Sequence, residues 1–199
     1  MTHRLPTRLT GHNLTLRPFC PADRPLIAQA LDDVEIIQWA TGAHLQSLPA
    51  DERAERWLST RLAAWSDGIP QFAIADPRTD RLTGYIGLRR IDNGNAEVGS
   101  WIAPWARRQG LAANALLTAA RWALTPAARG GLGLHRIALH HSTGNPASCT
   151  VAARAGLLLE GVMRDAATDH TGTRYDSHLH ARLATDPEPD ERVPALPRP

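Results

Sequence analysis

The sequence predicts a single α/β domain built on one mixed sheet. Segments with the two-residue apolar period of strands alternate with segments of helical period. Their order is three strands, helix, strand, helix and two strands, behind an N-terminal strand and helices. The chain has 199 residues, 43% of them apolar, which is enough for one full core without a disulfide staple. We expect the domain to cover residues 13–185, between a flexible N-terminus (1–12) and a disordered Pro-rich tail (186–199).

The N-terminal part combines one strand with two helices. Asn13 to Pro18 alternates apolar and polar residues, and its proline closes this first strand. Pro21 to Asp33 opens with proline and an acid and has one apolar face, which predicts a helix. Leu48 to Asp67 has apolar residues at helical spacing and stops at Gly68, so it is the second predicted helix.

From Gln71 the apolar period changes to two, which predicts an antiparallel meander. Asp92-Asn-Gly94 is a strong hairpin turn, because Asn-Gly tolerates positive φ. The strands expected here are Phe72–Ala75, Leu82–Ile91 and Ala96–Ile102.

The second half alternates helices and strands. Gly110 to Leu124 carries no charge between Arg108 and Arg121, so this helix must be largely buried. The remaining elements expected are a strand over Leu134–His141, a helix over Asn145–Ala155 stopped by Gly156, and strands over Leu157–Met163 and Tyr175–Leu183.

All 22 basic side chains are arginine, and lysine is absent. This excludes a Schiff-base lysine, a phosphate-loop lysine and a kinase strand lysine. The net charge of +2 is too small to indicate nucleic-acid binding. No apolar run is long enough for a membrane span and no secretory signal precedes Leu14, so we expect a cytoplasmic protein.

Metal-binding signals in the sequence are weak. Cys20 and Cys149 are isolated, which argues against a zinc knuckle or a disulfide framework. His178 and His180 lie one strand repeat apart, a spacing that metals can use, but no third ligand is near in sequence. We therefore expect no metal.

The most informative stretch is Trp105 to Ala112. A first helical turn normally favours acids, yet this one has none, and two arginines stand just before it. Gly110 lets a ligand approach the backbone closely. A phosphate or pyrophosphate is the natural occupant, and a solvated basic loop is the alternative.

The spacing Arg107-x-x-Gly110-x-Ala112, after a strand ending in Trp101-Ile-Ala-Pro104, resembles the coenzyme A pyrophosphate loop of the GCN5-related N-acetyltransferases. The ordered set that follows is similar to the branch of ribosomal-protein N-terminal (Rim-type) acetyltransferases, over about Leu14 to Ala184. That set comprises Leu134-His-Arg-Ile137, Asn145-Pro-Ala-Ser148, Ala155-Gly-Leu157, Leu159-Glu-Gly161, Arg164-Asp165 and Tyr175-Asp176.

The resemblance implies the fold of that family, a mostly antiparallel central sheet with a splay between two strands and flanking helices. It implies acetyl-CoA as co-substrate, bound in the splay between Ala96–Ile102 and Leu134–His141, and an acceptor amine that attacks the thioester directly. The residues implied to bind the coenzyme are Trp101, Ile102, Ala103, Arg107, Arg108, Gln109, Gly110, Leu111, Ala112 and Asn145.

Glu97 is the first choice for the catalytic base, and Ser148 for the acid that protonates the thiolate. Structural roles compete with both: Glu97 as a surface strand carboxylate and Ser148 as a first-turn hydroxyl behind an Asn145 N-cap. Some Rim-type enzymes carry a second glutamate where this chain has Ala167. Either Glu97 does the work, or Asp165 or a histidine such as His140 takes over.

Three functions remain open. The first is acetylation of a protein or peptide N-terminal α-amine. The second is acetylation of a small amine such as an antibiotic, a polyamine or an amino-acid derivative. The third is a catalytically weak acyl-CoA-binding sensor or partner. A cationic drug would need acids at the acceptor groove, and the N-terminal helices offer several. These acids are Asp32, Asp33, Glu35, Asp51 and Glu52.

We expect coenzyme A and an amine acceptor as partners, neither nucleic acid nor membrane, with a homodimer left open.

Overall fold

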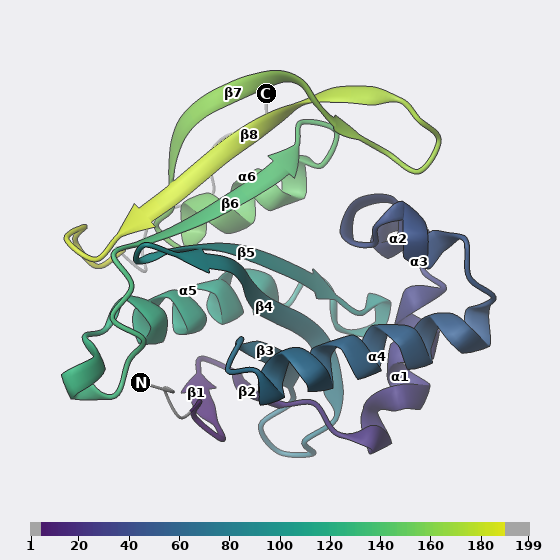
Figure 1. Cartoon of the computed structure of the whole chain (residues 1–199), viewed down its shortest axis with the longest axis horizontal. Coiled ribbons are helices and arrows are strands. Elements are labelled where there is room, and N and C mark those ends of the chain that lie inside the picture. Colours follow the sequence, from purple (N-terminus) through teal and green to yellow (C-terminus); the bar gives the residue numbers. More distant parts are fainter. Residues whose placement is uncertain (1–4, 190–199) are drawn as a thin grey trace.

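A computed structural model describes residues 5–189, except for the side chains at positions 43, 44 and 51. Within that range the chain forms one mixed sheet flanked by helices, as the sequence predicts (Figure 1). The strands are β1 (Leu9–Gly11), β2 (Leu14–Pro18), β3 (Gln71–Ala75), β4 (Leu82–Asp92), β5 (Asn95–Ile102), β6 (Arg136–Ser142), β7 (Leu158–Thr168) and β8 (Arg174–Leu183). The α-helices are α1 (Arg24–Leu31), α2 (Val34–Ala40), α3 (Ala43–Gln46), α4 (Ala50–Ser66), α5 (Leu111–Leu124) and α6 (Pro146–Arg154).

The described strands follow the spatial order β1-β2-β3-β4-β5-β6-β8-β7, and every neighbouring pair is antiparallel except β5 and β6. The meander β3–β4–β5 is confirmed. Its second turn holds Asn93 at φ 48° and Gly94 at φ 75°, the left-handed conformation that the Asn-Gly dipeptide tolerates. The parallel pair β5–β6 requires a crossover, and α5 supplies it.

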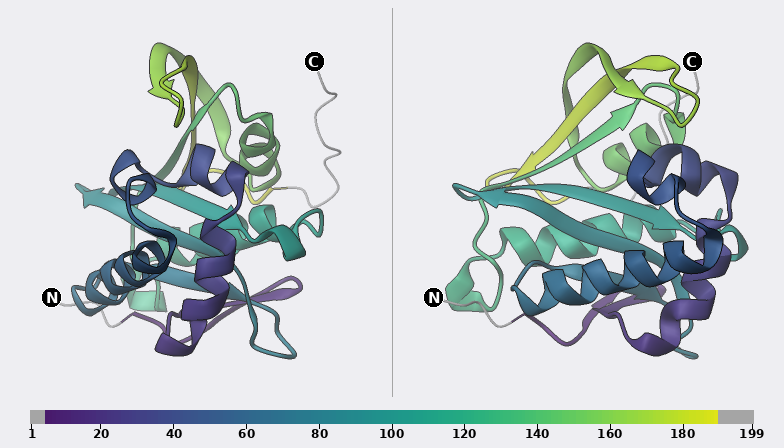
Figure 2. Two further views of the ribbon diagram at one scale, coloured as in Figure 1. Left: turned by 90° about the vertical axis from the view of Figure 1, so that its right-hand side faces the viewer. Right: turned by 45° about the vertical axis from the view of Figure 1, so that its right-hand side comes forward.

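Helices cover both faces of the sheet. Figure 2 shows α1 to α4 on one side and α5 and α6 on the other. Each face encloses its own hydrophobic cluster, because the side chains of a strand alternate between the faces. Val98 of β5 belongs to the cluster under α5 and α6, whereas Trp101 belongs to the cluster under α1, α2 and α4. Helix α5, uncharged up to Arg121, is largely buried, as its composition predicts.

The region around α1 to α3 differs from the sequence expectation. The helix predicted over Pro21–Asp33 is a short 3₁₀ turn (Pro21–Asp23) followed by α1, and two further helices that were not predicted follow it. Asp33 separates α1 from α2, because its extended backbone and its side chain, which accepts from the Ile36 N–H at 3.0 Å, make it an N-cap.

The ends of the domain also differ. Residues 9–11, expected to be flexible, form β1 against β2, because Asn13 at φ 53° permits a tight turn between the strands. At the other end, Glu188 pairs with Arg121 at 2.8 Å and with Arg182 at 3.2 Å. The first residues of the predicted tail are therefore packed, and the tail from 190 to 199 lies outside the described residues.

Strand β7 continues five residues past its expected end at Met163. The pairing of β7 with β8 is irregular between Met163 and Ala167, where Asp165 has a φ of 53°, and this interruption hides the strand from a period-two pattern. None of the helices in residues 5–189 combines the length and apolar composition that crossing a bilayer requires.

Candidate active site

The two parallel strands of the sheet separate part of the way along their length. β5 and β6 pair at Asn95↔Arg136, Ala96↔Ile137 and Glu97↔Ala138, and no pair is formed beyond Glu97. Figure 1 shows the two ribbons together at one end and apart at the other. A cavity of about 1180 Å³ lies in this splay, bounded by α2, the N-terminal ends of α5 and α6, and part of β7. The splay expected from the resemblance is therefore present.

The N-terminus of α5 is exposed to this cavity. The first hydrogen bond within α5 runs from the Asn114 N–H to the Gly110 carbonyl at 3.1 Å, so the preceding amide groups have no partner inside the helix. Gly110 is the N-cap at φ 74°, and Arg108 also has a positive φ of 64°. Both line the cavity, together with Leu111 and Ala112. Outward-facing amides at a positive helix end form a site suited to an anion such as a pyrophosphate.

The guanidinium of Arg107 is directed elsewhere than expected. It forms an ion pair with Asp33, and its Nη1 lies 3.0 Å from Glu35 Oε2 in α2. The Arg107 side chain still lines the cavity, but its charge is used to hold α2 against the loop. Arg108 is exposed, and no ion pair is found for it within the described residues. Arg108 is thus the better placed of the two to meet an anion.

We expect Asp33→Asn to destabilise the protein at neutral pH by about 1 kcal/mol, because Asn keeps the N-cap but loses the charged contact to Arg107. Burial alone would raise the pKa of Asp33, but the hydrogen bond from Arg107 and the backbone N–H groups lower it overall. A lowered carboxyl pKa contributes stability above the unfolded-state pKa of about 3.9, and this contribution is lost as the pH falls through the folded-state pKa. Urea unfolding at pH 7 and at pH 3 checks this: a difference that does not shrink at pH 3 would contradict the ion-pair explanation.

The backbone groups expected to hold the coenzyme are only partly available. The Ala103 N–H donates to the Thr83 carbonyl of β4 at 2.9 Å, and Ala103 is fully buried away from the cavity. Ala103 is thus outside the cavity lining, and its N–H already has a partner. Backbone groups alternate between the two edges of a strand, so Trp101 also directs its groups towards β4, whereas those of Ile102 and Ser100 face the unpaired side. The side chain of Trp101 does line the cavity.

Gln109 and Asn145 differ in their positions. The Gln109 side chain is exposed outside the cavity lining, and its carbonyl accepts from Asn13 Nδ2 at 3.3 Å. Asn145 lines the cavity and caps α6, where its Oδ1 accepts from the Ser148 N–H at 3.4 Å. Ser148 is half-buried and also lines the cavity. The capping role of Asn145 thus coexists with a position at the ligand site.

Glu97 lies in the last paired position of β5, just before the splay. Its side chain is 16% exposed and bonded to Arg90 at 2.7 Å and to Arg89 at 3.3 Å, and it is outside the set of residues that line the cavity. Burial acts to raise the pKa of Glu97, but the hydrogen bond from Arg90 and the neighbouring positive charges outweigh burial and lower it. The carboxylate is therefore charged at neutral pH and weakly basic.

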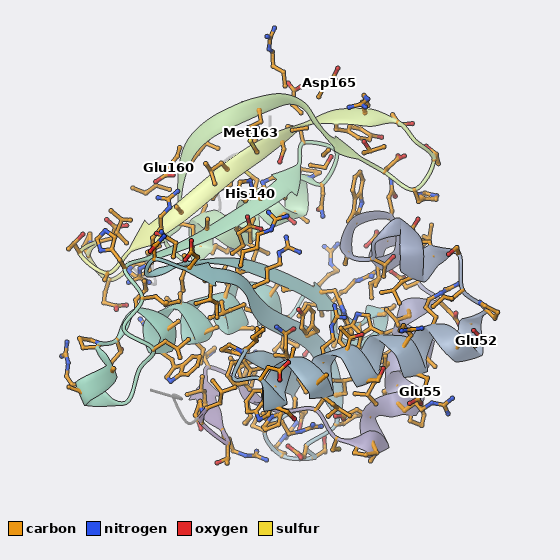
Figure 3. All side chains as sticks on the ribbon, in the orientation of Figure 1. Glu52, Glu55, His140, Glu160, Met163 and Asp165 are labelled. Atoms are coloured by element: carbon orange, nitrogen blue, oxygen red, sulfur yellow. The ribbon has the colours of Figure 1, made fainter. Side chains whose placement is uncertain are left out.

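His140 is the titratable group that connects Glu97 to the cavity. Its Nε2 lies 3.9 Å from Glu97 Oε1, its side chain is 31% exposed, and it lines the cavity. Figure 3 places His140 on β6 and Asp165 on the outer side of β7, and Asp165 is not among the residues that line the cavity. Ala167 lines the cavity. Of the two residues considered as a base in place of a glutamate at position 167, Asp165 and His140, only His140 lines the cavity.

The cavity has a basic lining that sequence reasoning did not find. Arg61 of α4, Arg89 of β4 and Arg154 of α6 line it, and they come from three distant segments. Arg61 stacks over the Trp57 ring at 4.2 Å, and burial lowers its pKa. Glu35 is the one acid among the lining residues that are described, and Arg107 neutralises it.

The other acids considered for a cationic acceptor are not in the lining. Asp33 is paired with Arg107, Asp32 lies 3.8 Å from Arg53, and Glu52 is exposed on α4, away from His140 in Figure 3. The side chain of Asp51 is outside what the structure describes. The cavity therefore has a net positive lining.

Comparison with solved structures places this fold among acetyltransferases. An acetyltransferase (GNAT family) from Bacillus anthracis superposes with a TM-score of 0.76 at 17% identity, covering 90% of this chain and 99% of that one. The ribosomal-protein-S5-alanine acetyltransferase from Vibrio fischeri gives 0.73 at 18% identity, covering 92% and 100%. Mycobacterium smegmatis RimJ in complex with CoA-disulfide gives 0.72 at 19% identity, covering 89% and 86%. These likenesses establish the fold.

A sequence-family comparison supplies the assignment. No curated protein matches the chain. The family model for the acetyltransferase (GNAT) domain matches residues 13–158, which is most of the chain and includes the splay and the N-terminus of α5. The protein therefore belongs to the GNAT family and is an N-acetyltransferase.

Proposed function

We propose that this acetyltransferase transfers the acetyl group of acetyl-CoA to the α-amino group of a protein or peptide N-terminus. The observation that carries the proposal is the cavity in the splay, which combines an open helix N-terminus with a net positive lining. The RimJ and S5-alanine acetyltransferase structures share the fold over about nine-tenths of this chain. These two structures support a protein or peptide N-terminus as the class of acceptor.

The described residues fit coenzyme A at this site. The amides at the start of α5 and the exposed guanidinium of Arg108 suit the pyrophosphate, and Arg154 adds a second cation at the cavity wall. Ile102 and Ser100 offer backbone groups to the pantetheine arm along the unpaired edge of β5. When bound, acetyl-CoA supplies an activated thioester, so the protein needs no nucleophile of its own.

The remaining demand is for proton transfer. His140 is the group that accepts the proton of the acceptor ammonium, because its imidazole reaches the cavity. Glu97 acts through His140 as a positioning residue, with its carboxylate held by Arg89 and Arg90. Ser148, at the first turn of α6, supplies the hydroxyl that protonates the departing thiolate.

Charge separates the candidate acceptors. A polyamine or an aminoglycoside carries several positive charges. Even with Arg154 at the pyrophosphate and Arg89 paired with Glu97, it would meet the guanidinium of Arg61 with a single neutralised acid in the lining. A peptide N-terminus brings one ammonium, and an acidic residue behind it would complement Arg61. The basic lining therefore supports a peptide acceptor over a cationic small amine.

A panel assay tests the proposal. The protein is incubated with acetyl-CoA and one acceptor at a time, and release of free thiol is followed. We expect turnover with peptides that have a free N-terminus and a neutral or acidic second residue, and none with the same peptides blocked at the N-terminus. Turnover restricted to polyamines or aminoglycosides would replace the proposal with the small-amine function. Tight coenzyme binding with no thiol release on any acceptor would support the sensor function.

A further inference from the structure

Four metal-ligating side chains meet on the face of the sheet opposite to His140. His141 of β6 lies directly across from His178 of β8, and His180 is two residues further along β8. Residues two apart on a strand, and residues directly opposite on neighbouring strands, project to the same face, so the three imidazoles share one side. Helix α6 covers that side and brings Cys149 to the group. The potential ligand atoms all lie within 4.8 Å of one another.

Three of the distances within the group are close to those of a four-coordinate zinc site, and the whole group, within 4.8 Å, would have to contract around an ion. His141 Nε2 lies 3.3 Å from His180 Nε2, and Cys149 Sγ lies 3.6 Å from His180 Nε2 and 3.9 Å from His178 Nδ1. With Zn–N bonds of about 2.0 Å and a Zn–S bond of about 2.3 Å, the edges of a tetrahedron are about 3.3 Å between nitrogens and about 3.5 Å between nitrogen and sulfur. Two of the three distances are thus close to the zinc values already, and the third needs a shift of a few tenths of an ångström.

The tautomer of His141 also suits a ligand. Its Nδ1 lies 2.8 Å from the Ser142 carbonyl, which can only accept, so Nδ1 carries the hydrogen and donates it. In the neutral ring the lone pair is then on Nε2, the atom that faces His180. A backbone carbonyl that fixes the second nitrogen is the usual support of a metal-bound histidine. His141 and His180 are buried, and Cys149 and His178 are partly exposed, which leaves an entry path for an ion.

We propose that His141, Cys149, His178 and His180 bind one Zn²⁺ ion in a closed structural site that joins α6 to β6 and β8. One thiolate and three imidazoles are donors that favour Zn²⁺ over Mg²⁺ or Ca²⁺. All four positions are filled by the protein, so the site has no open position for a substrate. The ion would act on the enzyme by holding α6 and β6 in fixed positions. Cys149 of α6 adjoins Ser148, and His141 of β6 adjoins His140, so the ion would also fix the positions of Ser148 and His140.

This proposal revises the sequence expectation of no metal. The pair His178 and His180 was recognisable from its spacing, but the other two ligands come from β6 and α6, thirty or so residues earlier in the chain. Only the β6–β8 register and the packing of α6 bring them together.

The test uses the full chain prepared without a polyhistidine tag. After removal of metals with a chelator, Zn²⁺ is titrated in competition with a chromophoric indicator. We expect one Zn²⁺ per chain with a submicromolar Kd, and binding about 100-fold weaker in Cys149→Ser and in His178→Gln. The matched controls are Cys20→Ser and His170→Gln, which alter exposed residues outside the cluster and should bind as the wild type does.

Two further measurements, the spectrum of the Co²⁺ form and the thermal midpoint with Zn²⁺, test the site in the wild-type protein as well as in the variants. Co²⁺ in place of Zn²⁺ should give the intense visible bands of a tetrahedral site and a thiolate-to-cobalt charge-transfer band, which Cys149→Ser should lose. Zn²⁺ should raise the thermal midpoint by about 5 °C or more in the wild type and in Cys20→Ser, but not in Cys149→Ser. A stoichiometry well below one, an octahedral cobalt spectrum, or equal binding in Cys149→Ser would each overturn the proposal. In that case the cluster is a hydrogen-bonded histidine pair beside a thiol.

Discussion

Gly110→Glu is expected to weaken coenzyme A binding by about 100-fold or more. The new carboxylate would stand at the N-terminus of α5, where the outward-facing amides of the first turn would otherwise meet the pyrophosphate. Repulsion between like charges at such a partly exposed site amounts to about 3 kcal/mol, which is about 100-fold in affinity. Isothermal titration with coenzyme A measures it directly. An affinity within threefold of the wild type would contradict the placement of the pyrophosphate.

Two controls separate charge from conformation. Gly110 has a φ of 74°, which strains any other residue, but the nearest atom to an added Cβ is Asn114 Nδ2 at 3.9 Å, so steric contact is minor. Gly110→Gln adds the same bulk and strain without charge, and we expect it to cost only about tenfold in affinity. Gly68 has a similar φ of 79° with open space around it and lies outside the cavity lining. Gly68→Glu should therefore leave coenzyme binding unchanged.

His140→Gln is expected to lower kcat/KM by about 100-fold at neutral pH, because it removes the base that faces the cavity. Coenzyme binding should stay within threefold, since glutamine preserves size and polarity. The matched control is His135→Gln, an exposed histidine five residues earlier that lies outside the cavity lining. Steady-state kinetics with a peptide acceptor, paired with coenzyme titration, distinguishes lost catalysis from lost binding.

Glu97→Gln distinguishes the two candidate bases. The pKa of Glu97 is lowered, so its carboxylate is charged from mildly acidic pH upwards and does not titrate across the working range. We expect a loss of about tenfold in kcat/KM for Glu97→Gln, smaller than the loss for His140→Gln under the same conditions. The reverse pattern would return Glu97 to the role of direct base and remove His140 from it.

Much of the fold could be predicted because its signals are local. The Asn93-Gly94 turn, the uncharged stretch of α5 and the proline after Asn145 each act through backbone conformation or burial within a few residues. The open N-terminus of α5 was recognisable for the same reason, since Gly110 and the absence of acids in the first turn are contiguous in sequence. The N-terminal helices were harder, because the C-cap of α1, Asp32, is followed directly by the N-cap of α2, Asp33.

The partners of charged side chains were not predictable in this way. Arg107 was expected at the pyrophosphate, but Asp33 and Glu35, more than seventy residues earlier, take its guanidinium. Glu97 was the expected base, but Arg89 and Arg90 from the neighbouring strand hold its carboxylate. Ion pairs form between whichever groups the packing brings within reach, and sequence distance does not limit them.

The sequence alone established the α/β domain and the family resemblance, and it predicted the open helix end at Gly110, because each depends on contiguous residues. The tertiary structure decided which side chains face the cavity and which face α6. His140 and His141 show why: adjacent residues on a strand point to opposite faces, so His140 lies beside Glu97 whereas His141 joins Cys149, His178 and His180, although both border the cavity. Which partners each then meets depends on the register of β6 with β5 and β8, and that register is set by long-range packing.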